Sequence, residues 1–180
     1  ISPGIESDLK TNYQKKNERT AFAAMQILFE NKMVTEIFKE GILNVNKNTS
    51  LRGRWEKVSN NPLIIADVAH NEEGFKEVIS EIKKIKSQRK IFVLGFVKDK
   101  PIEKIIKLFP KEGIYLFSSP KISRAFSLER LNLILKNTDI NYKIFGSIEE
   151  AYNKALNYAS KEDFIFVGGS NFTVSEILNP

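Results

Sequence analysis

Residues 63–71 read LIIADVAHN and mark the point where a buried segment gives way to a polar one. The apolar run at the start predicts a strand, and the amphipathic stretch that begins at Gly74 predicts a helix. In an open parallel sheet, ligands bind at the carboxyl ends of the strands, where a helix N-terminus offers free N–H groups. We therefore expect a ligand site at this junction, with Asp67 and His70, the only histidine, as candidate residues.

Strand and helix patterns alternate from residue 63 to the end of the chain. The predicted strands cover 63–67, 91–96, 114–117, 142–145 and 164–168, and the predicted helices cover 72–86, 101–108, 128–135, 148–159 and 172–178. Apolar strands separated by amphipathic helices are typical of a mainly parallel sheet that is covered on both faces. The predicted fold class is therefore α/β, with a Rossmann-like, mostly parallel sheet and helices on both faces.

The first third of the chain has a different character. Apolar residues recur at helical spacing over 13–29, and a second helix is predicted over 34–43. The polar stretch 44–50 lacks both periodicities and predicts a linker, so we place a domain boundary there, between a helical segment at 1–45 and a Rossmann-like domain at 46–180. Because the chain begins with Ile1 rather than methionine, we expect it to be a piece of a longer polypeptide.

Four predicted strand ends carry polar or flexible residues and point to the same edge of the sheet. They are 67–71, Gly95 with 98–100, 118–120, and 168–171. In the last of these, glycine lets the backbone approach a ligand where a side chain would clash. That segment can bring backbone N–H groups and the Ser170 hydroxyl close to a small molecule.

Some of these features also have a purely structural interpretation. The pair 168–169 fits a tight strand-to-helix turn whose N-cap is Ser170 or the next residue. Residues 98–100 fit a solvated loop in which Asp99 caps the following helix. A lone histidine is more often a packed or capping residue, but the position of His70 at a strand end favours a function.

The composition narrows the function classes. The chain has no cysteine, which excludes disulfide scaffolds, thiolate metal sites and cysteine nucleophiles and favours a reducing compartment. No apolar segment approaches the roughly 20 residues needed to cross a bilayer, and signal-peptide features are absent, so we expect a cytoplasmic protein without a membrane partner. The net charge of +6 is spread over solvated faces such as 82–91, where lysines alternate with isoleucines, which argues against nucleic-acid binding.

Several common catalytic motifs are missing from the sequence. It contains no G-x-x-x-x-G-K-S/T phosphate loop, no G-x-G-x-x-G after a strand and no nucleophile elbow. One histidine without cysteine argues against a zinc site. We therefore expect that this chain does not hold a triphosphate by itself in the usual way.

Five short segments occur in the order and spacing of a known family. Three are YQKKN at 13–17, GRWE at 53–56 and DVAHN at 67–71, and two weaker ones are 95–100 and 169–170. Together they resemble the C-terminal half of the folylpolyglutamate synthase and dihydrofolate synthase enzymes, members of the Mur ligase superfamily. The Ala-His-Asn version of the third segment favours the folate branch, and the peptidoglycan ligases are close relatives.

The resemblance implies an ATP-dependent ligase that adds L-glutamate to a folate or dihydropteroate carboxylate through an acyl phosphate. It implies that residues 1–45 are the tail of the central ATP-binding domain and that 46–180 form the C-terminal, amino-acid-binding domain. The phosphate loop and the Mg²⁺ ligands would lie upstream, so we expect the chain alone to be inactive. The resemblance further implies a monomer with ATP and Mg²⁺ as cofactors.

The same resemblance implies roles for five residues. Asn17, Arg54 and Asp67 would contact ATP, and His70 and Ser170 would be the catalytic residues that position the incoming glutamate. A guanidinium pairs bidentately with phosphate oxygens, and a carboxylate suits a ribose hydroxyl or an ammonium group. Closing one domain on the other would exclude water, which would otherwise hydrolyse the acyl phosphate.

Three other interpretations stay open. The first is a peptidoglycan-type ligase of the same superfamily. The second is a stand-alone Rossmann-like module that binds a small ligand, with Asp67 marking the pocket. The third is a basic nucleic-acid-binding domain, which a steep fall of DNA affinity with salt would support.

Overall fold

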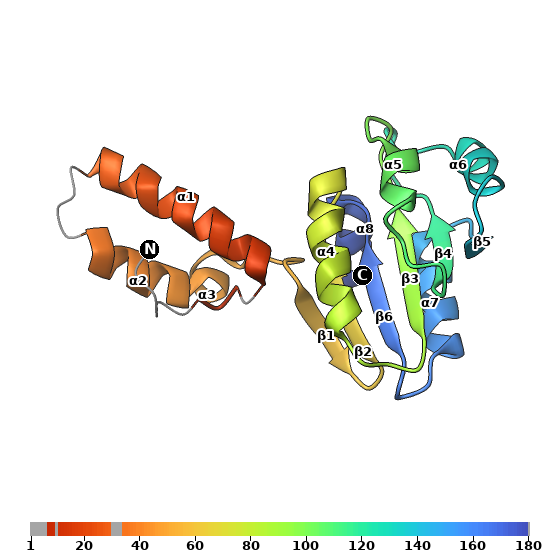
Figure 1. The fold of residues 1–180 in the computed structure, drawn as a ribbon, viewed down its shortest axis with the longest axis horizontal. Coiled ribbons are helices and arrows are strands. Elements are labelled where there is room, and N and C mark those ends of the chain that lie inside the picture. The colour runs from red at the N-terminus through yellow and green to blue at the C-terminus, as the bar shows by residue number, and fades with distance from the viewer. Residues whose placement is uncertain (1–6, 10, 30–33, 180) are drawn as a thin grey trace. The chain divides into compact units, whose positions relative to one another are not determined.

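The computed structural model describes residues 7–9, 11–29 and 34–179 (Figure 1). The chain divides into two compact units, Ile1–Trp55 and Glu56–Pro180, and each is described by itself. The first unit is helical, and the second contains a β-sheet with helices. None of the helices in the described part of the chain is both long and apolar enough to span a bilayer.

Helices α1 (Asn12–Leu28), α2 (Val34–Leu43) and α3 (Val45–Thr49) form the first unit. The helices predicted at 13–29 and 34–43 are confirmed. Phe22 of α1 packs edge-on against Phe38 of α2, with 5.0 Å between the ring centroids. The prediction of an irregular linker at 44–50 is wrong, because α3 occupies that stretch.

Helix α3 has no apolar periodicity, and a side chain distant in the sequence supports its first turn. The Oδ2 atom of Asp8 accepts a hydrogen bond from the N–H of Asn46 at 2.8 Å. This bond satisfies one of the N–H groups that a helix start leaves without a partner. The division between the two units falls after Trp55, later in the chain than the boundary expected at residue 45, and the assignment of 1–45 and 46–180 to domains stays a prediction.

The second unit is built on a six-stranded sheet with the order β1-β2-β6-β3-β4-β5. The strands are β1 (Glu56–Asn60), β2 (Leu63–Asp67), β3 (Lys90–Gly95), β4 (Ile114–Ser118), β5 (Asn141–Ile144) and β6 (Phe164–Gly168). Strands β2 to β6 are parallel, and β1 pairs antiparallel with β2 at one edge. The predicted α/β, Rossmann-like and mostly parallel sheet is therefore confirmed.

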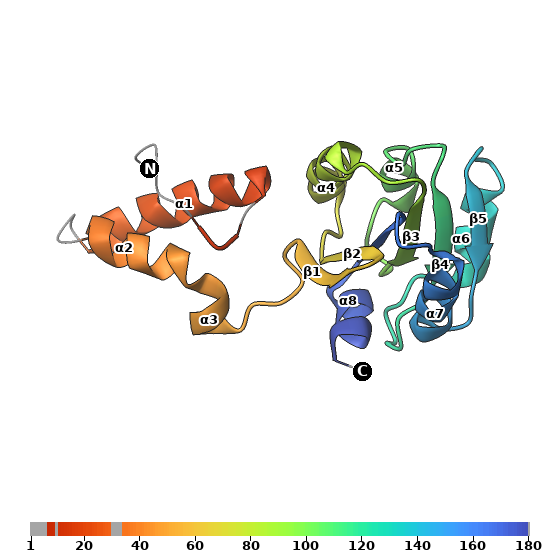
Figure 2. The same cartoon turned by 90° about the horizontal axis from the view of Figure 1, so that it is seen from below.

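Helices cover both faces of this sheet. Helices α4 (Glu72–Lys84) and α5 (Ile102–Ile106) lie on one face, and α7 (Ile148–Tyr158) and α8 (Asn171–Leu178) lie on the other (Figure 2). The remaining helix, α6 (Leu128–Leu135), packs beside β5. The N-cap position of α5 is Pro101, without a side-chain hydrogen bond, so the predicted cap by Asp99 is wrong.

The two faces of the sheet bury different side chains, because successive residues of a strand point to opposite sides. Ile91 and Val93 of β3 belong to an aliphatic cluster with residues of α7 and α8. Phe92, between them, stacks on Tyr115 of β4 with 4.7 Å between the ring centroids. Burial on both sides explains why the central strands are apolar without interruption.

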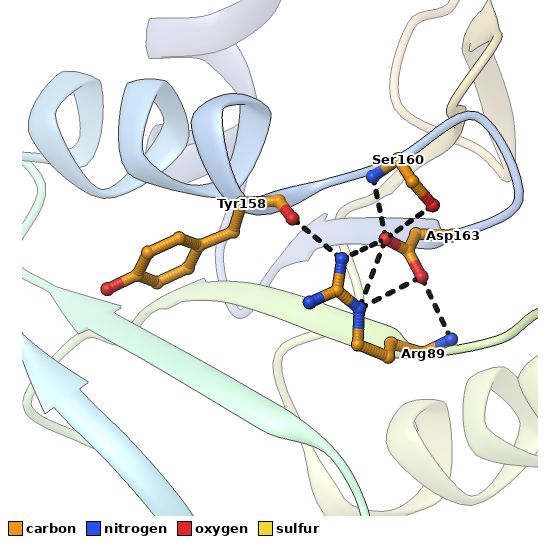
Figure 3. A network of polar contacts seen from close by, with 4 residues as sticks. All are labelled: Arg89, Tyr158, Ser160 and Asp163. Carbon is orange, nitrogen blue, oxygen red and sulfur yellow. Dashed lines mark hydrogen bonds and ion pairs between the residues drawn. The ribbon is translucent and has the colours of Figure 1, made fainter.

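A polar network ties together the starts of β3 and β6 and the end of α7, remote from the carboxyl ends of the strands (Figure 3). Asp163 is only 2% exposed and accepts hydrogen bonds from the Arg89 guanidinium at 2.6 Å and the Ser160 N–H at 2.7 Å. Arg89 also donates to the carbonyl of Tyr158 at 2.7 Å. The hydrogen bonds from Arg89 are the largest cause of the lowered pKa of Asp163, about 2.

Candidate functional site

The carboxyl ends of four parallel strands are neighbours in the sheet. Asp67 at the end of β2 is in register with Gly168 of β6, and Gly168 is in register with Leu94 of β3. Gly95 of β3 is in register with Ser118 of β4. The prediction that these strand ends share one edge of the sheet is confirmed.

Asp67 shapes the turn that follows β2. It is 2% exposed, and its Oδ1 accepts the N–H of Ala69 at 2.9 Å. Four residues later, the side chain of Asn71 caps helix α4 by accepting the N–H of Gly74 at 2.8 Å. The DVAHN segment is therefore a compact strand-to-helix turn that presents His70 between two local hydrogen bonds.

The half-buried ring of His70 is oriented by its own backbone. Its Nδ1 lies 3.1 Å from the carbonyl oxygen of Val68. A carbonyl oxygen only accepts hydrogen bonds, so this contact requires the proton on Nδ1. In the neutral ring the remaining nitrogen, Nε2, is then a hydrogen-bond acceptor.

Ser170 is the N-cap of α8, and it is one of the two residues that the structural interpretation of this turn named for that position. Its Oγ accepts the N–H of Thr173 at 3.1 Å and lies 2.9 Å from Thr173 Oγ1. The hydroxyl of Thr173 donates to the carbonyl of Gly95 at 2.9 Å. Since that bond uses the single hydroxyl proton of Thr173, Ser170 must donate its own proton to Thr173 Oγ1.

Gly169 allows β6 and β3 to approach closely at this edge. It has a φ of +101°, which side chains rarely adopt, and a Cβ at this position would lie 2.5 Å from the carbonyl oxygen of Gly95. The glycine therefore serves the turn itself. The close approach also brings Thr173 within reach of Gly95.

A cavity of about 130 Å³ opens at the ends of β3 and β6. His70 and Ser170, one hundred positions apart in the sequence, both line it. The other lining residues are Val97, Lys100, Arg124, Asn171 and Phe172. Pockets for drug-sized ligands measure roughly 300–1,000 Å³, so this cavity suits a molecule the size of an amino acid better than a nucleotide.

Two lining residues, Arg124 and Phe172, were not among the sequence candidates. The guanidinium carbon of Arg124 lies 5.5 Å from the centroid of the Phe172 ring, in the range of a cation–π contact. Arg124 belongs to the connection between β4 and α6, where no strand-end position or motif signals a function. Only the position of Phe172 at the start of α8, next to the predicted 168–171 segment, offered a sequence signal.

The remaining predicted site residues lie elsewhere. Asn17 is exposed on α1, and its side-chain amide donates to Gln14 at 2.9 Å. Arg54 is exposed between Gly53 and Trp55, which have positive φ values of 69° and 52°. These residues belong to the first unit, and Asp67 does not line the cavity of the second. Within the described residues, no group of three or more Asp, Glu or His side chains is placed to hold a metal ion.

The structure is an α/β domain with a cavity at the carboxyl ends of its parallel strands, the edge at which such sheets bind their ligands. More particularly, the chain belongs to the Mur ligase family, because residues 53–171 match the family described as Mur ligase, glutamate ligase domain. This confirms the family to which the sequence segments pointed.

Individual relatives agree with this family. The chain is 37% identical over 150 residues to a dihydrofolate synthase/folylpolyglutamate synthase of Buchnera aphidicola subsp. Acyrthosiphon pisum, covering 82% of this chain and 35% of that protein. It is 29% identical over 143 residues to a 2,6-diaminopimelate ligase of Prochlorococcus marinus subsp. pastoris, covering 71% of this chain and 28% of that protein.

A solved structure extends the likeness to the fold. It is a bifunctional folylpolyglutamate synthase/dihydrofolate synthase with Mn, AMPPNP and L-glutamate bound, which is 25% identical with a TM-score of 0.66. The match covers 80% of this chain and 34% of that one. The chain thus spans about a third of the length of the folate-branch relatives that it matches.

Proposed function

We propose that this chain is the amino-acid-binding part of an ATP-dependent ligase that joins L-glutamate to the carboxylate of folate or dihydropteroate. The observation that carries the proposal is the amino-acid-sized cavity lined by both His70 and Ser170. The names of the folate-branch relatives and the L-glutamate bound in the solved neighbour support this choice of substrate. In this role His70 and Ser170 position the amino acid for attack on the activated carboxylate.

The residues proposed for ATP contact have suitable chemistry. ATP, when bound, supplies the phosphoryl group that activates the carboxylate. The exposed guanidinium of Arg54 can pair with phosphate oxygens, and the exposed amide of Asn17 can hydrogen-bond to polar groups of the nucleotide. The Asp67 carboxylate ends β2 outside the small cavity, which leaves that cavity to the amino acid. Mg²⁺ would be held by an upstream domain of a monomeric, cytoplasmic enzyme.

The domain assignment forms part of the same proposal. Residues 1–45 would be the tail of the central ATP-binding domain, and residues 46–180 would be the C-terminal domain. One specific observation supports the peptidoglycan-type alternative, namely the 29% identity to a diaminopimelate ligase. The two candidates differ in the amino acid that the cavity takes.

Titration of the ¹⁵N-labelled chain with L-glutamate, with meso-diaminopimelate and with MgATP tests the proposal. We expect L-glutamate to shift the amide signals of Val97, His70 and Ser170, and MgATP to shift those near Arg54. A His70→Ala variant should weaken glutamate binding. The matched control, Asn137→Ala, changes an exposed residue beside a different cavity and should leave binding unchanged.

The outcomes separate the candidate functions. Shifts at the cavity with diaminopimelate but not with glutamate would assign the chain to the peptidoglycan branch. Shifts at the cavity with neither amino acid would overturn the proposed substrate, and the stand-alone module would then be the better interpretation. Equal binding by the wild type and the His70→Ala variant would remove His70 from the site.

A further inference from the structure

The hydroxyl of Tyr158 accepts a hydrogen bond from a lysine. Tyr158 is the last residue of α7, and the ammonium group of Lys143 on β5 donates to its Oη at 3.0 Å. An ammonium group only donates, so this bond uses a lone pair of the phenolic oxygen and not the phenolic proton. The contact therefore favours the form of Tyr158 in which the oxygen carries a negative charge.

A second ammonium group lies against the same ring. Lys154 is four positions before Tyr158 on α7, a spacing that places both side chains on one face of the helix. The Nζ atom of Lys154 is 4.7 Å from the centroid of the Tyr158 ring, and that of Lys143 is 5.5 Å from it. Both distances are in the range of a cation–π contact. Two elements thus each bring one positive charge to the phenol.

Both lysines make Tyr158 more acidic. The hydrogen bond from Lys143 is the largest cause of a pKa below the ordinary value of tyrosine, and the charges of Lys143 and Lys154 add to this effect against the opposing effect of burial. Arg89 also contacts Tyr158, but it donates to the backbone carbonyl, and its charge is paired with that of Asp163.

The backbone of Tyr158 is fixed, whereas its hydroxyl lies near the surface. Figure 3 shows the ring pointing away from the polar network, in which Arg89 holds the Tyr158 carbonyl at 2.7 Å. The half-buried ring packs against the aliphatic cluster on this face of the sheet. The hydrogen bond to the exposed Lys143 is open to solvent. A small reagent can therefore reach an oxygen that is already held in place.

Other tyrosines of the chain lack this environment. The hydroxyl of Tyr142 donates to the amide oxygen of Asn132 at 3.0 Å, so its proton is used in that bond. Tyr115 is fully buried, and burial raises its pKa. Burial also raises the pKa of the half-buried Tyr152. Of these four tyrosines, Tyr158 is the one whose oxygen accepts a hydrogen bond from a cation.

We propose that Tyr158 is a nucleophilic tyrosine and a site of covalent acylation by small activated acyl donors. The phenolic oxygen attacks the acyl carbon and forms an aryl ester, and the bond to the leaving group breaks with its electron pair on that group. The phenolic proton passes through water to the leaving group, while Lys143 keeps its own proton and stabilises the charge on the oxygen.

This site is independent of the proposed function. Tyr158 ends α7 beside the starts of β3 and β6, whereas the cavity that contains His70 and Ser170 opens at the other ends of these strands. Acylation of Tyr158 therefore needs neither the amino acid nor ATP.

The test treats the 180-residue chain with N-acetylimidazole at pH 7 and follows each tyrosine by peptide mass mapping. We expect Tyr158 to be acetylated at least about threefold faster than Tyr142. A lower pKa raises the ionised fraction of a nucleophile more than it reduces the reactivity of the ionised form, as for thiolates. Hydroxylamine should remove the acetyl group, because it cleaves a tyrosine ester but not a lysine amide.

Three variants assign the effect to its cause. Lys143→Met removes the donor and should slow the acetylation of Tyr158 to about the rate of Tyr142, whereas Lys143→Arg keeps the charge and should retain most of the reactivity. The matched control is Lys136→Met, which changes an exposed lysine at the end of α6 and should leave the rate of Tyr158 unchanged. A titration of phenolate absorbance, taken as the difference between the wild type and Tyr158→Phe, gives a second measurement. Its midpoint should lie higher when Lys143 is replaced by Met in both chains.

Several results would overturn the proposal. Equal acetylation rates of Tyr158 and Tyr142 in the wild type would show that the phenol is not activated. An unchanged rate and titration midpoint in Lys143→Met would remove Lys143 as the cause. An acetyl group that resists hydroxylamine and maps to Lys143 would make the lysine the nucleophile. None of these results bears on glutamate binding, so the proposed function stands or falls separately.

Discussion

Replacing Asp163 with asparagine removes the charge at the centre of the network that joins β3, β6 and α7 (Figure 3). The carboxylate is buried and accepts hydrogen bonds from Arg89 and Ser160, including both of their backbone N–H groups. An asparagine has one acceptor oxygen, and its NH₂ group would face donors. We therefore expect a marked loss of stability, because the N–H groups that donate to this buried carboxylate lose a charged acceptor.

The magnitude follows from the pKa. In the folded chain the pKa of Asp163 falls from 3.8 to about 2, chiefly through the hydrogen bonds from Arg89. A pKa difference of one unit corresponds to about 1.4 kcal/mol, so the ionised carboxylate contributes about 2 kcal/mol of stability. Because the folded pKa is the lower one, this contribution is present above pH 3.8 and is lost as the pH falls through about 2.

Urea unfolding at pH 7 and at pH 2, followed by the amide signals of β3 and β6, measures this contribution. We expect Asp163→Asn to be less stable than the wild type by about 2 to 3 kcal/mol at pH 7 and by about 1 kcal/mol or less at pH 2. Asp139→Asn is the control, because the side chain of Asp139, which pairs with Lys111, is 80% exposed. We expect this substitution to change the free energy of unfolding little. An equal difference at both pH values would refute the reasoning.

Two substitutions at the sheet edge test the packing beneath the cavity. In urea unfolding, Gly169→Ala should destabilise the chain by at least about 2 kcal/mol, because its Cβ would meet the Gly95 carbonyl at a positive φ. The control Gly41→Ala, whose Cβ meets nothing within 4 Å, should not destabilise the chain. Equal stability of Gly169→Ala and the wild type would contradict the close approach. Thr173→Val should lower the free energy of unfolding by about 1 to 2 kcal/mol, because the hydrogen bonds to Gly95 and Ser170 are lost. Thr173→Ser keeps the hydroxyl and should recover most of this stability; equal losses in both variants would show that the hydroxyl is unimportant.

Sequence pattern predicted the second unit well because its strands are buried on both faces. An uninterrupted apolar run such as that of β6 leaves little ambiguity once amphipathic segments flank it. Strand β1 escaped prediction because it lies at the sheet edge and Val58 is its only apolar residue, so no periodicity marks it. Helix α3 was not predicted because its residues show no apolar periodicity, and the hydrogen bond from Asn46 to Asp8, far away in the sequence, leaves no local signal.

In the candidate site, too, residues marked by a local sequence pattern were predicted, and a residue placed by distant contacts was not. His70 and Ser170 each follow a buried strand directly, so a local pattern was enough to place both at the carboxyl edge of the sheet. Arg124 follows no such signal, because its position depends on hydrogen bonding to Lys98, a residue of a different connection. The strand order explains why both kinds of residue meet. Strand β6, the last in the sequence, lies between β2 and β3, and this arrangement brings His70, Ser170 and Arg124 to one cavity. The cavity is therefore a product of the sheet topology, which no single motif of the chain encodes.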